Sequence, residues 1–168
     1  MLEWSDIILR LGVATLAGGL IGLNRDLRGK PIGLKTLGIV GLSTATVVVV
    51  AVQFTEVGRI TDATSRVIQG ILTGIGFLGA GVIVREREPF RVRGLTSAAC
   101  AFLAACIGIV SGAGEWRIVA TALAIALILL TVGRRTERFL HRKLGGNDDP
   151  DEQHTAATPP QPQPPASR

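Results

Sequence analysis

The sequence predicts an all-α integral membrane protein, folded as a compact bundle of five short, glycine-rich transmembrane helices. Three observations support this prediction. Apolar residues gather in five long runs, short charged loops join the runs, and small residues recur at four-residue spacing inside them. Hydrophobic residues make up 47% of the chain and charged residues 18%. Because the charges largely avoid the runs, each run is more apolar than the chain as a whole.

The five runs are close to the length that a membrane-spanning helix needs. A helix of 15–18 residues is roughly 22–27 Å long at 1.5 Å per residue. Flanking residues must then complete the crossing of a hydrocarbon core about 30 Å thick. Five such runs in succession are typical of a multi-pass membrane protein, and they cover residues 7–23, 37–54, 67–84, 95–110 and 118–132.

The first run carries an unusual pair of charges. Glu3 and Asp6 occupy the place where a cleavable signal peptide has basic residues, and Arg10 interrupts the apolar stretch. Asp6 and Arg10 are four residues apart, so they share a helix face. Pairing lowers the cost of an arginine in hydrocarbon, which is ~3 kcal/mol or more. We predict an intramembrane ion pair, for which a structural and a functional role are both open.

The third run contains a glycine pattern that also occurs in nucleotide-binding enzymes. Residues 74–81 read GIGFLGAG, and the first six fit G-x-G-x-x-G. A dinucleotide-binding loop needs a strand before the pattern and a helix after it, but here the pattern lies inside one apolar run. We therefore predict no bound cofactor and no enzyme activity. Membrane fractionation distinguishes the soluble oxidoreductase alternative from a membrane protein.

Small residues inside the runs predict close packing between helices. Hydrophobic force between helices is weak in a bilayer, so association depends on backbone contact at small side chains. The third run is especially rich in glycine, which predicts that it is the crowded centre of the bundle. A helix bent or unwound over residues 74–81 that lines an ion site is the alternative. The candidate packing residues are Gly18, Gly22, Gly70, Gly74, Gly76, Gly79 and Gly81.

The distribution of positive charge predicts the orientation. Alternate loops differ, with thirteen Lys and Arg residues on one side of the membrane and three on the other. By the positive-inside rule the N-terminus lies outside and the C-terminus in the cytoplasm. The loops are nearly free of aromatic residues that could stack bases, so we expect no nucleic-acid partner. The thirteen are Arg25, Arg28, Lys30, Lys35, Arg85, Arg87, Arg91, Arg93, Arg134, Arg135, Arg138, Arg142 and Lys143.

Composition divides the chain into three parts. Residues 1–133 form the predicted transmembrane domain, and residues 134–144 form a basic juxtamembrane helix end. Residues 145–168 hold six of the eight prolines. This tail is expected to be disordered, because it cannot bury enough apolar surface to offset the entropy cost of ordering.

Two motifs resemble the signatures of a known family. The first is Ala17-Gly18-Gly19-Leu20-Ile21-Gly22, then Arg25-Asp26 and Gly33-Leu34-Lys35-Thr36. The second is the stretch 74–83 with Arg85-Glu86 and then Arg93-Gly94-Leu95-Thr96-Ser97-Ala98-Ala99. Together they cover roughly residues 6–112 and resemble the MgtC/SapB family of bacterial inner-membrane proteins, some of which are associated with virulence.

The resemblance implies a regulatory multi-pass protein of the bacterial inner membrane, linked to magnesium limitation and to survival under acid or intracellular stress. In some members regulation acts through the F-type ATP synthase, so that enzyme or another membrane protein is the implied partner besides the lipid bilayer. Family members usually carry a glutamate where this chain has Asn24, and longer members add a soluble domain after the fifth helix. The alternative function is a small channel or carrier for an ion or small solute, assembled as a homo-oligomer.

The candidate functional face lies at the predicted cytoplasmic ends of the helices. Adjacent acids and bases in the two Arg-rich loops can pair with each other, or with a divalent ion or an acidic partner segment. Cys100 and Cys106 lie on different faces of one helix, so we expect small core residues rather than metal ligands. The residues of this candidate face are Arg25, Asp26, Lys35, Thr36, Arg85, Glu86 and Thr96.

The predicted orientation can be tested by cysteine labelling in intact cells, on a background in which Cys100 and Cys106 are replaced. We expect Arg28→Cys and Arg91→Cys to resist a membrane-impermeant thiol reagent until the cells are permeabilised, because both positions lie in loops predicted to be cytoplasmic. Labelling of either variant before permeabilisation would overturn this orientation.

Overall fold

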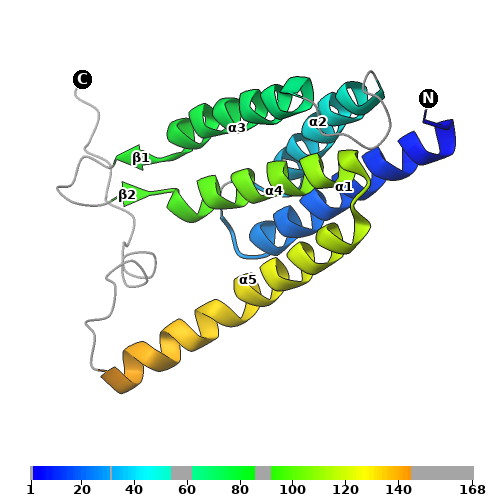
Figure 1. Cartoon of the computed structure of the whole chain (residues 1–168). Coiled ribbons are helices and arrows are strands. Elements are labelled where there is room, and N and C mark those ends of the chain that lie inside the picture. Colours follow the sequence, from blue (N-terminus) through cyan, green and yellow to red (C-terminus); the bar gives the residue numbers. More distant parts are fainter. Residues whose placement is uncertain (1, 31, 54–61, 86–91, 145–168) are drawn as a thin grey trace, which may run out of the picture. The chain divides into compact units, whose positions relative to one another are not determined.

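The computed structural model describes residues 2–30, 32–53, 62–85 and 92–144. Within these ranges lie five helices and one two-stranded hairpin (Figure 1). In chain order they are α1 (Trp4–Asp26), α2 (Leu34–Gln53), α3 (Asp62–Val82), β1 (Val84–Arg85), β2 (Val92–Arg93), α4 (Leu95–Ala113) and α5 (Trp116–Leu144).

The structure confirms the five predicted helices, and four of them meet the length and composition of a membrane span. Helices α1, α2, α3 and α4 are each long and apolar enough to cross a bilayer, and α5 contains a shorter apolar stretch, Trp116–Val132. The small hairpin was not predicted. Its antiparallel register pairs Val84 with Arg93 and Arg85 with Val92. The β-branched valines favour this extended conformation over a further helical turn.

The chain divides into two compact units, Met1–Thr131 and Val132–Arg168. The division falls within α5, two residues before the boundary expected between the transmembrane domain and the basic helix end. The backbone remains helical through residue 144. The predicted disordered tail, 145–168, lies outside the described residues.

Helices α1, α2 and α4 form the centre of the first unit. Their buried side chains, among them Ile21, Leu37 and Ile107, belong to the hydrophobic core. In the most apolar stretch of α4, 56% of the residues are buried inside the molecule, whereas in α3 the share is 11%. The expectation that the third helix is the crowded centre is therefore wrong for the single chain.

The central helices touch backbone to backbone along their length. A Cβ added at Gly41 would lie 2.5 Å from the carbonyl oxygen of Ala14, and one at Gly108 would lie 2.5 Å from that of Gly41. Gly18 meets the Leu37 carbonyl at closer range still. These distances leave no room for a side chain, so glycine is what lets the three helices approach one another.

The glycines of α3 have a different environment. At Gly70, Gly74, Gly76 and Gly81 an added Cβ would meet nothing within 4 Å, and at Gly79 it would make an ordinary contact of 3.6 Å with Ala98. The four open glycines are not packing positions within the chain, whereas Gly79 is buried against α4. Spacing alone misled the prediction, because a glycine pair marks a face able to pack and does not say whether a neighbour occupies it.

Matched alanine substitutions test this assignment. We expect Gly108→Ala to lower the free energy of unfolding by about 1–3 kcal/mol, because its methyl group would force the backbones of α2 and α4 apart. Gly74→Ala has open space around it and should be neutral or stabilising by about 0.5–1 kcal/mol, because alanine is the better helix former. Both are measured by thermal unfolding in detergent, and equal destabilisation by the two would contradict the central role of α2 and α4.

Candidate functional site

Arg25 is the last residue of a continuous buried face on α1. That face runs through Ala14, Gly18, Ile21 and Gly22 and ends at Arg25, which is 5% exposed. Residues spaced by three or four positions lie on one side of a helix. The same periodicity that directs the small residues inward therefore directs the guanidinium of Arg25 into the core rather than to the surface.

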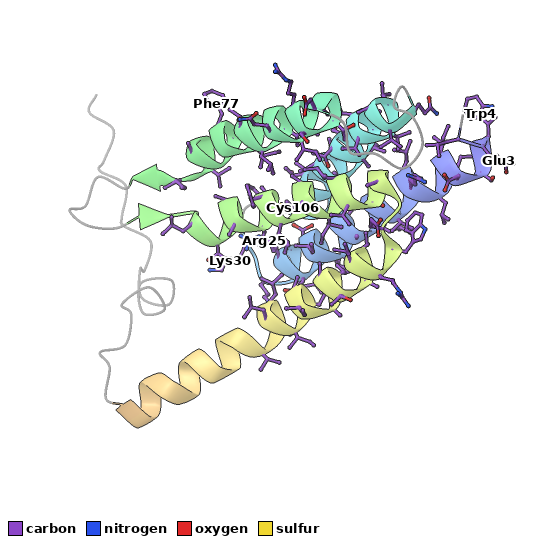
Figure 2. The ribbon with its side chains drawn as sticks, in the orientation of Figure 1. Glu3, Trp4, Arg25, Lys30, Phe77 and Cys106 are labelled. Atoms are coloured by element: carbon purple, nitrogen blue, oxygen red, sulfur yellow. The ribbon has the colours of Figure 1, made fainter. Side chains whose placement is uncertain are left out.

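The guanidinium of Arg25, a residue labelled in Figure 2, contacts two side chains of α4. Its Nη2 donates a hydrogen bond to the hydroxyl oxygen of Ser97, and its Nη1 donates to Cys100 Sγ at 3.5 Å. Ser97 and Cys100 are both buried and lie three residues apart, so they share one face of α4. Three polar groups from two helices thus meet in an otherwise apolar core.

Two helix dipoles act on the charge of Arg25 in opposite directions. A cation at the C-terminal end of α1 interacts favourably with the dipole of that helix, but the first turn of α4 carries the opposite partial charge. Burying a guanidinium also costs desolvation energy that its hydrogen bonds must offset. An arginine kept there against these costs is a candidate functional residue, since the core could be filled more cheaply by an apolar side chain.

Asp26, the next residue, has a structural task. Its Oδ2 accepts a hydrogen bond of 2.8 Å from the backbone N–H of Leu34, the first residue of α2. This amide has no partner within its own helix. Gly33 lies so close to the Asp26 carboxylate that a Cβ there would collide with it. Asp26 therefore caps α2 and holds the beginning of that helix against the end of α1.

The other residues of the predicted functional face do not share one environment in the structure. Lys35, Thr36 and Thr96 are exposed. Arg85 lies in β1, and Glu86 lies outside the described residues. Arg25 is buried, so it does not belong to the exposed surface formed by these residues. The reason is the helix period, which places Arg25 inward and its neighbour Asp26 outward.

Asn24 stands where the family resemblance implies a glutamate. Its Oδ1 is buried and has no hydrogen-bond partner among the described residues.

The predicted ion pair forms at the opposite end of α1. Arg10 Nη2 lies 2.9 Å from Asp6 Oδ2, and Nη1 donates a hydrogen bond of 2.8 Å to the carbonyl oxygen of Gly112 in α4. Ser111 Oγ donates to the carbonyl oxygen of Arg10 at 2.9 Å. The guanidinium packs against Gly114, where a Cβ would lie 2.8 Å from Cζ. This network fastens α1 to the end of α4.

The two arginines define the two ends of the bundle. We call the region of Arg25, Asp26, Leu34 and Ser97 the Arg25 end, and the region of Asp6, Arg10 and 111–114 the Arg10 end. Among the residues that the structure describes, no group of three or more His, Cys, Asp or Glu side chains could hold a metal ion.

Ser97 and Cys100 are the site residues that sequence reasoning missed. The sequence contains a pattern from which a buried arginine could have been predicted. The small-residue face of α1 (Ala14, Gly18, Gly22) continues at helical spacing to Arg25, which predicts a buried arginine in need of polar partners. The sequence does not say which helix supplies those partners, since that depends on how α1 and α4 cross.

Comparisons with known proteins identify relatives across most of the chain. A family model described as the MgtC family matches residues 11–139. Protein SrpB of Synechococcus elongatus is 36% identical over 146 residues, which is 82% of this chain and 80% of that protein. No solved structure matches the chain.

Two further relatives are longer than the region they share with this chain. Protein MgtC of Brucella abortus is 41% identical over 119 residues, 70% of this chain and 48% of that protein. The Escherichia coli protein named "Putative magnesium transporter YhiD" is 34% identical over 133 residues, 76% of this chain and 60% of that protein. The chain therefore spans about half to three fifths of these two relatives.

The capping role of Asp26 predicts a clear order of stabilities. Asp26→Ala should lower the free energy of unfolding by about 1 kcal/mol, because the Leu34 amide loses its acceptor. Asp26→Asn should cost little, since the amide oxygen can accept the same hydrogen bond. Thermal unfolding measures both, with the exposed Thr36→Ala as a control expected to stay within about 0.5 kcal/mol. Equal losses for Asp26→Ala and Asp26→Asn would show that its charge matters more than the cap.

Proposed function

The chain belongs to the MgtC family, and we propose that it is a regulatory membrane protein linked to magnesium limitation and stress survival, acting through contact with another membrane protein. The link to magnesium is supported by family membership and by the name of the Escherichia coli relative, which refers to magnesium transport. The proposal involves no catalytic step and no cofactor.

The contact of Arg25 with Ser97 and Cys100 is the observation that carries this proposal. It joins α1 to the first turns of α4 inside the core, while Asp26 joins α1 to the first turn of α2. The exposed residues that begin α2 and α4, Thr36 and Thr96, are thereby presented on helix ends whose positions are held by buried hydrogen bonds. A preorganised surface of this kind suits recognition of a protein partner, because little ordering cost is left at binding.

In this proposal the protein lies in the bacterial inner membrane with the Arg25 end facing the cytoplasm. The support is the excess of Lys and Arg in the loops at that end, following the positive-inside rule. The partner is a second integral membrane protein, and the F-type ATP synthase is the first candidate because the family resemblance implies it.

A channel or carrier assembled from several copies is the second candidate, and the outward face of α3 favours it. Exposed residues there include Arg66, Gln69, Thr73 and four open glycines, besides Phe77, which is 80% exposed (Figure 2). The other helices expose bulky aliphatic side chains such as Leu16, Ile39 and Ile125. A small and polar face is suited to packing against protein or lining a path between subunits.

Ion flux separates the two candidates. The regulator predicts that the purified chain in liposomes carries no Mg²⁺ above the level of empty liposomes, because its central helices are packed backbone to backbone. The measurement uses an entrapped Mg²⁺-sensitive dye. Flux that is lost in Gly74→Leu and kept in Leu16→Ala, a lipid-facing control, would favour the oligomeric carrier.

Growth of a null strain in Mg²⁺-limited medium tests the regulatory site. We expect Arg25→Lys to fail to restore growth, because the ammonium group cannot reproduce the two divergent hydrogen bonds of the guanidinium. Ser97→Ala should weaken rescue partially, since one of those bonds is lost. Asp26→Asn and the exposed Arg66→Lys should rescue fully, and membrane levels are checked for every variant.

Crosslinking in intact membranes complements the growth assay. The same strains are crosslinked at high and low Mg²⁺, and captured proteins are identified by mass spectrometry. The proposal expects one membrane partner that is captured by the wild type and depleted in Arg25→Lys. Full rescue by Arg25→Lys, or a partner pattern unchanged in that variant, would remove the support for a specific site at Arg25.

A further inference from the structure

The loop between α1 and α2 is an ordered, positively charged element at the Arg25 end. We call it the basic loop and define it by its described residues, 27–30 and 32–33, together with Leu34 and Lys35, the first two residues of α2. Its backbone is held by hydrogen bonds from the N–H groups of Arg28 and Lys30 to the carbonyl oxygen of Arg25, at 3.0 and 3.2 Å. Ile32 adopts a left-handed conformation with φ 66° and packs against the hydrophobic core. Partial burial of this side chain offsets the strain of the backbone.

The charge of the basic loop is presented to its surroundings. Lys30 and Lys35 are exposed, and Figure 2 labels Lys30 in this loop. The Asp26 carboxylate accepts a hydrogen bond from the backbone N–H of Leu34. The salt bridge found within the described ranges, Arg10–Asp6, lies at the other end of the bundle and does not involve Lys30 or Lys35. Arg28 donates to the carbonyl oxygen of Leu130, which fixes the loop to α5.

The loop also carries an apolar side chain that faces outward. Leu27 is 79% exposed and follows Leu23, another exposed leucine of α1. The 23 residues of α1 make a helix about 34 Å long, which slightly exceeds a hydrocarbon core of about 30 Å. If α1 crosses the bilayer centred on its midpoint, Leu27 lies where the acyl chains end and the two lysines lie beside the headgroups.

We propose that the basic loop is a binding site for the headgroup of an anionic phospholipid. Lys30 and Lys35 bind the phosphate, and Leu27 contacts the upper part of the acyl chains. The charge complementarity supports this occupant, and the loop conformation, fixed by Asp26, Arg28 and Ile32, means that little order must be gained on binding. This inference does not depend on the regulatory function, since a carrier would hold the same lipid.

Lipid retention by the purified full-length chain tests the proposal. The chain is reconstituted in nanodiscs of phosphatidylcholine with phosphatidylglycerol as the minor lipid, and the lipid that stays bound after transfer to detergent is measured by native mass spectrometry. We expect wild type to retain phosphatidylglycerol selectively. Each of Lys30→Gln and Lys35→Gln should weaken retention about fivefold, and the double variant should combine the two losses.

The controls separate a specific site from general charge. The pair Arg66→Gln and Arg117→Gln removes two exposed arginines outside the basic loop and should leave retention unchanged. Thermal unfolding in pure phosphatidylcholine verifies that all variants are folded. Equal retention by wild type and the double lysine variant, or equal loss in the arginine pair, would overturn the proposal. Displacement of the lipid by millimolar inorganic phosphate would also overturn it, in favour of a site for free anions.

Discussion

Close contact between the backbones of α1, α2 and α4 is the constraint on which the rest of the structure depends. In a bilayer the hydrophobic effect does not draw one helix to another, so dispersion contacts at short range must supply the attraction. The short distance between helices is possible at Gly18, Gly41 and Gly108, because each has a carbonyl oxygen of the neighbouring helix in the place where a side chain would lie. The positions of the two arginines follow from this packing.

Each arginine fastens α1 to α4 at one end of the packed centre. Arg10 joins the end of α4 through Gly112 and is neutralised by Asp6, whereas Arg25 joins the beginning of α4 through Ser97 and Cys100. With both ends fastened by polar groups in an apolar medium, the three helices are expected to move as one body.

Helix α3 stands apart from this body in its packing and in the chemistry of its surface. Its Gly79 lies against Ala98 of α4, while its outward side carries exposed glycines and polar residues. The same glycines that serve no packing purpose within the chain are those that would let a second helix approach. The regulatory and the oligomeric-carrier proposals differ mainly in what they place against this side.

The sequence alone determined the membrane class, the number of helices and the pairing of Asp6 with Arg10, because apolar run length and i, i+4 spacing are local properties that a helix converts directly into geometry. Its two glycine-rich motifs were also specific enough to identify the family. Its glycine spacing could not determine which helix is central, since Gly70–Gly74 and Gly18–Gly22 look alike until a neighbour is placed beside them. The tertiary structure decided that α1, α2 and α4 pack together, and with that crossing it brought Ser97 and Cys100 to Arg25. Contacts between residues more than seventy positions apart depend on how helices cross, and no local pattern encodes that angle.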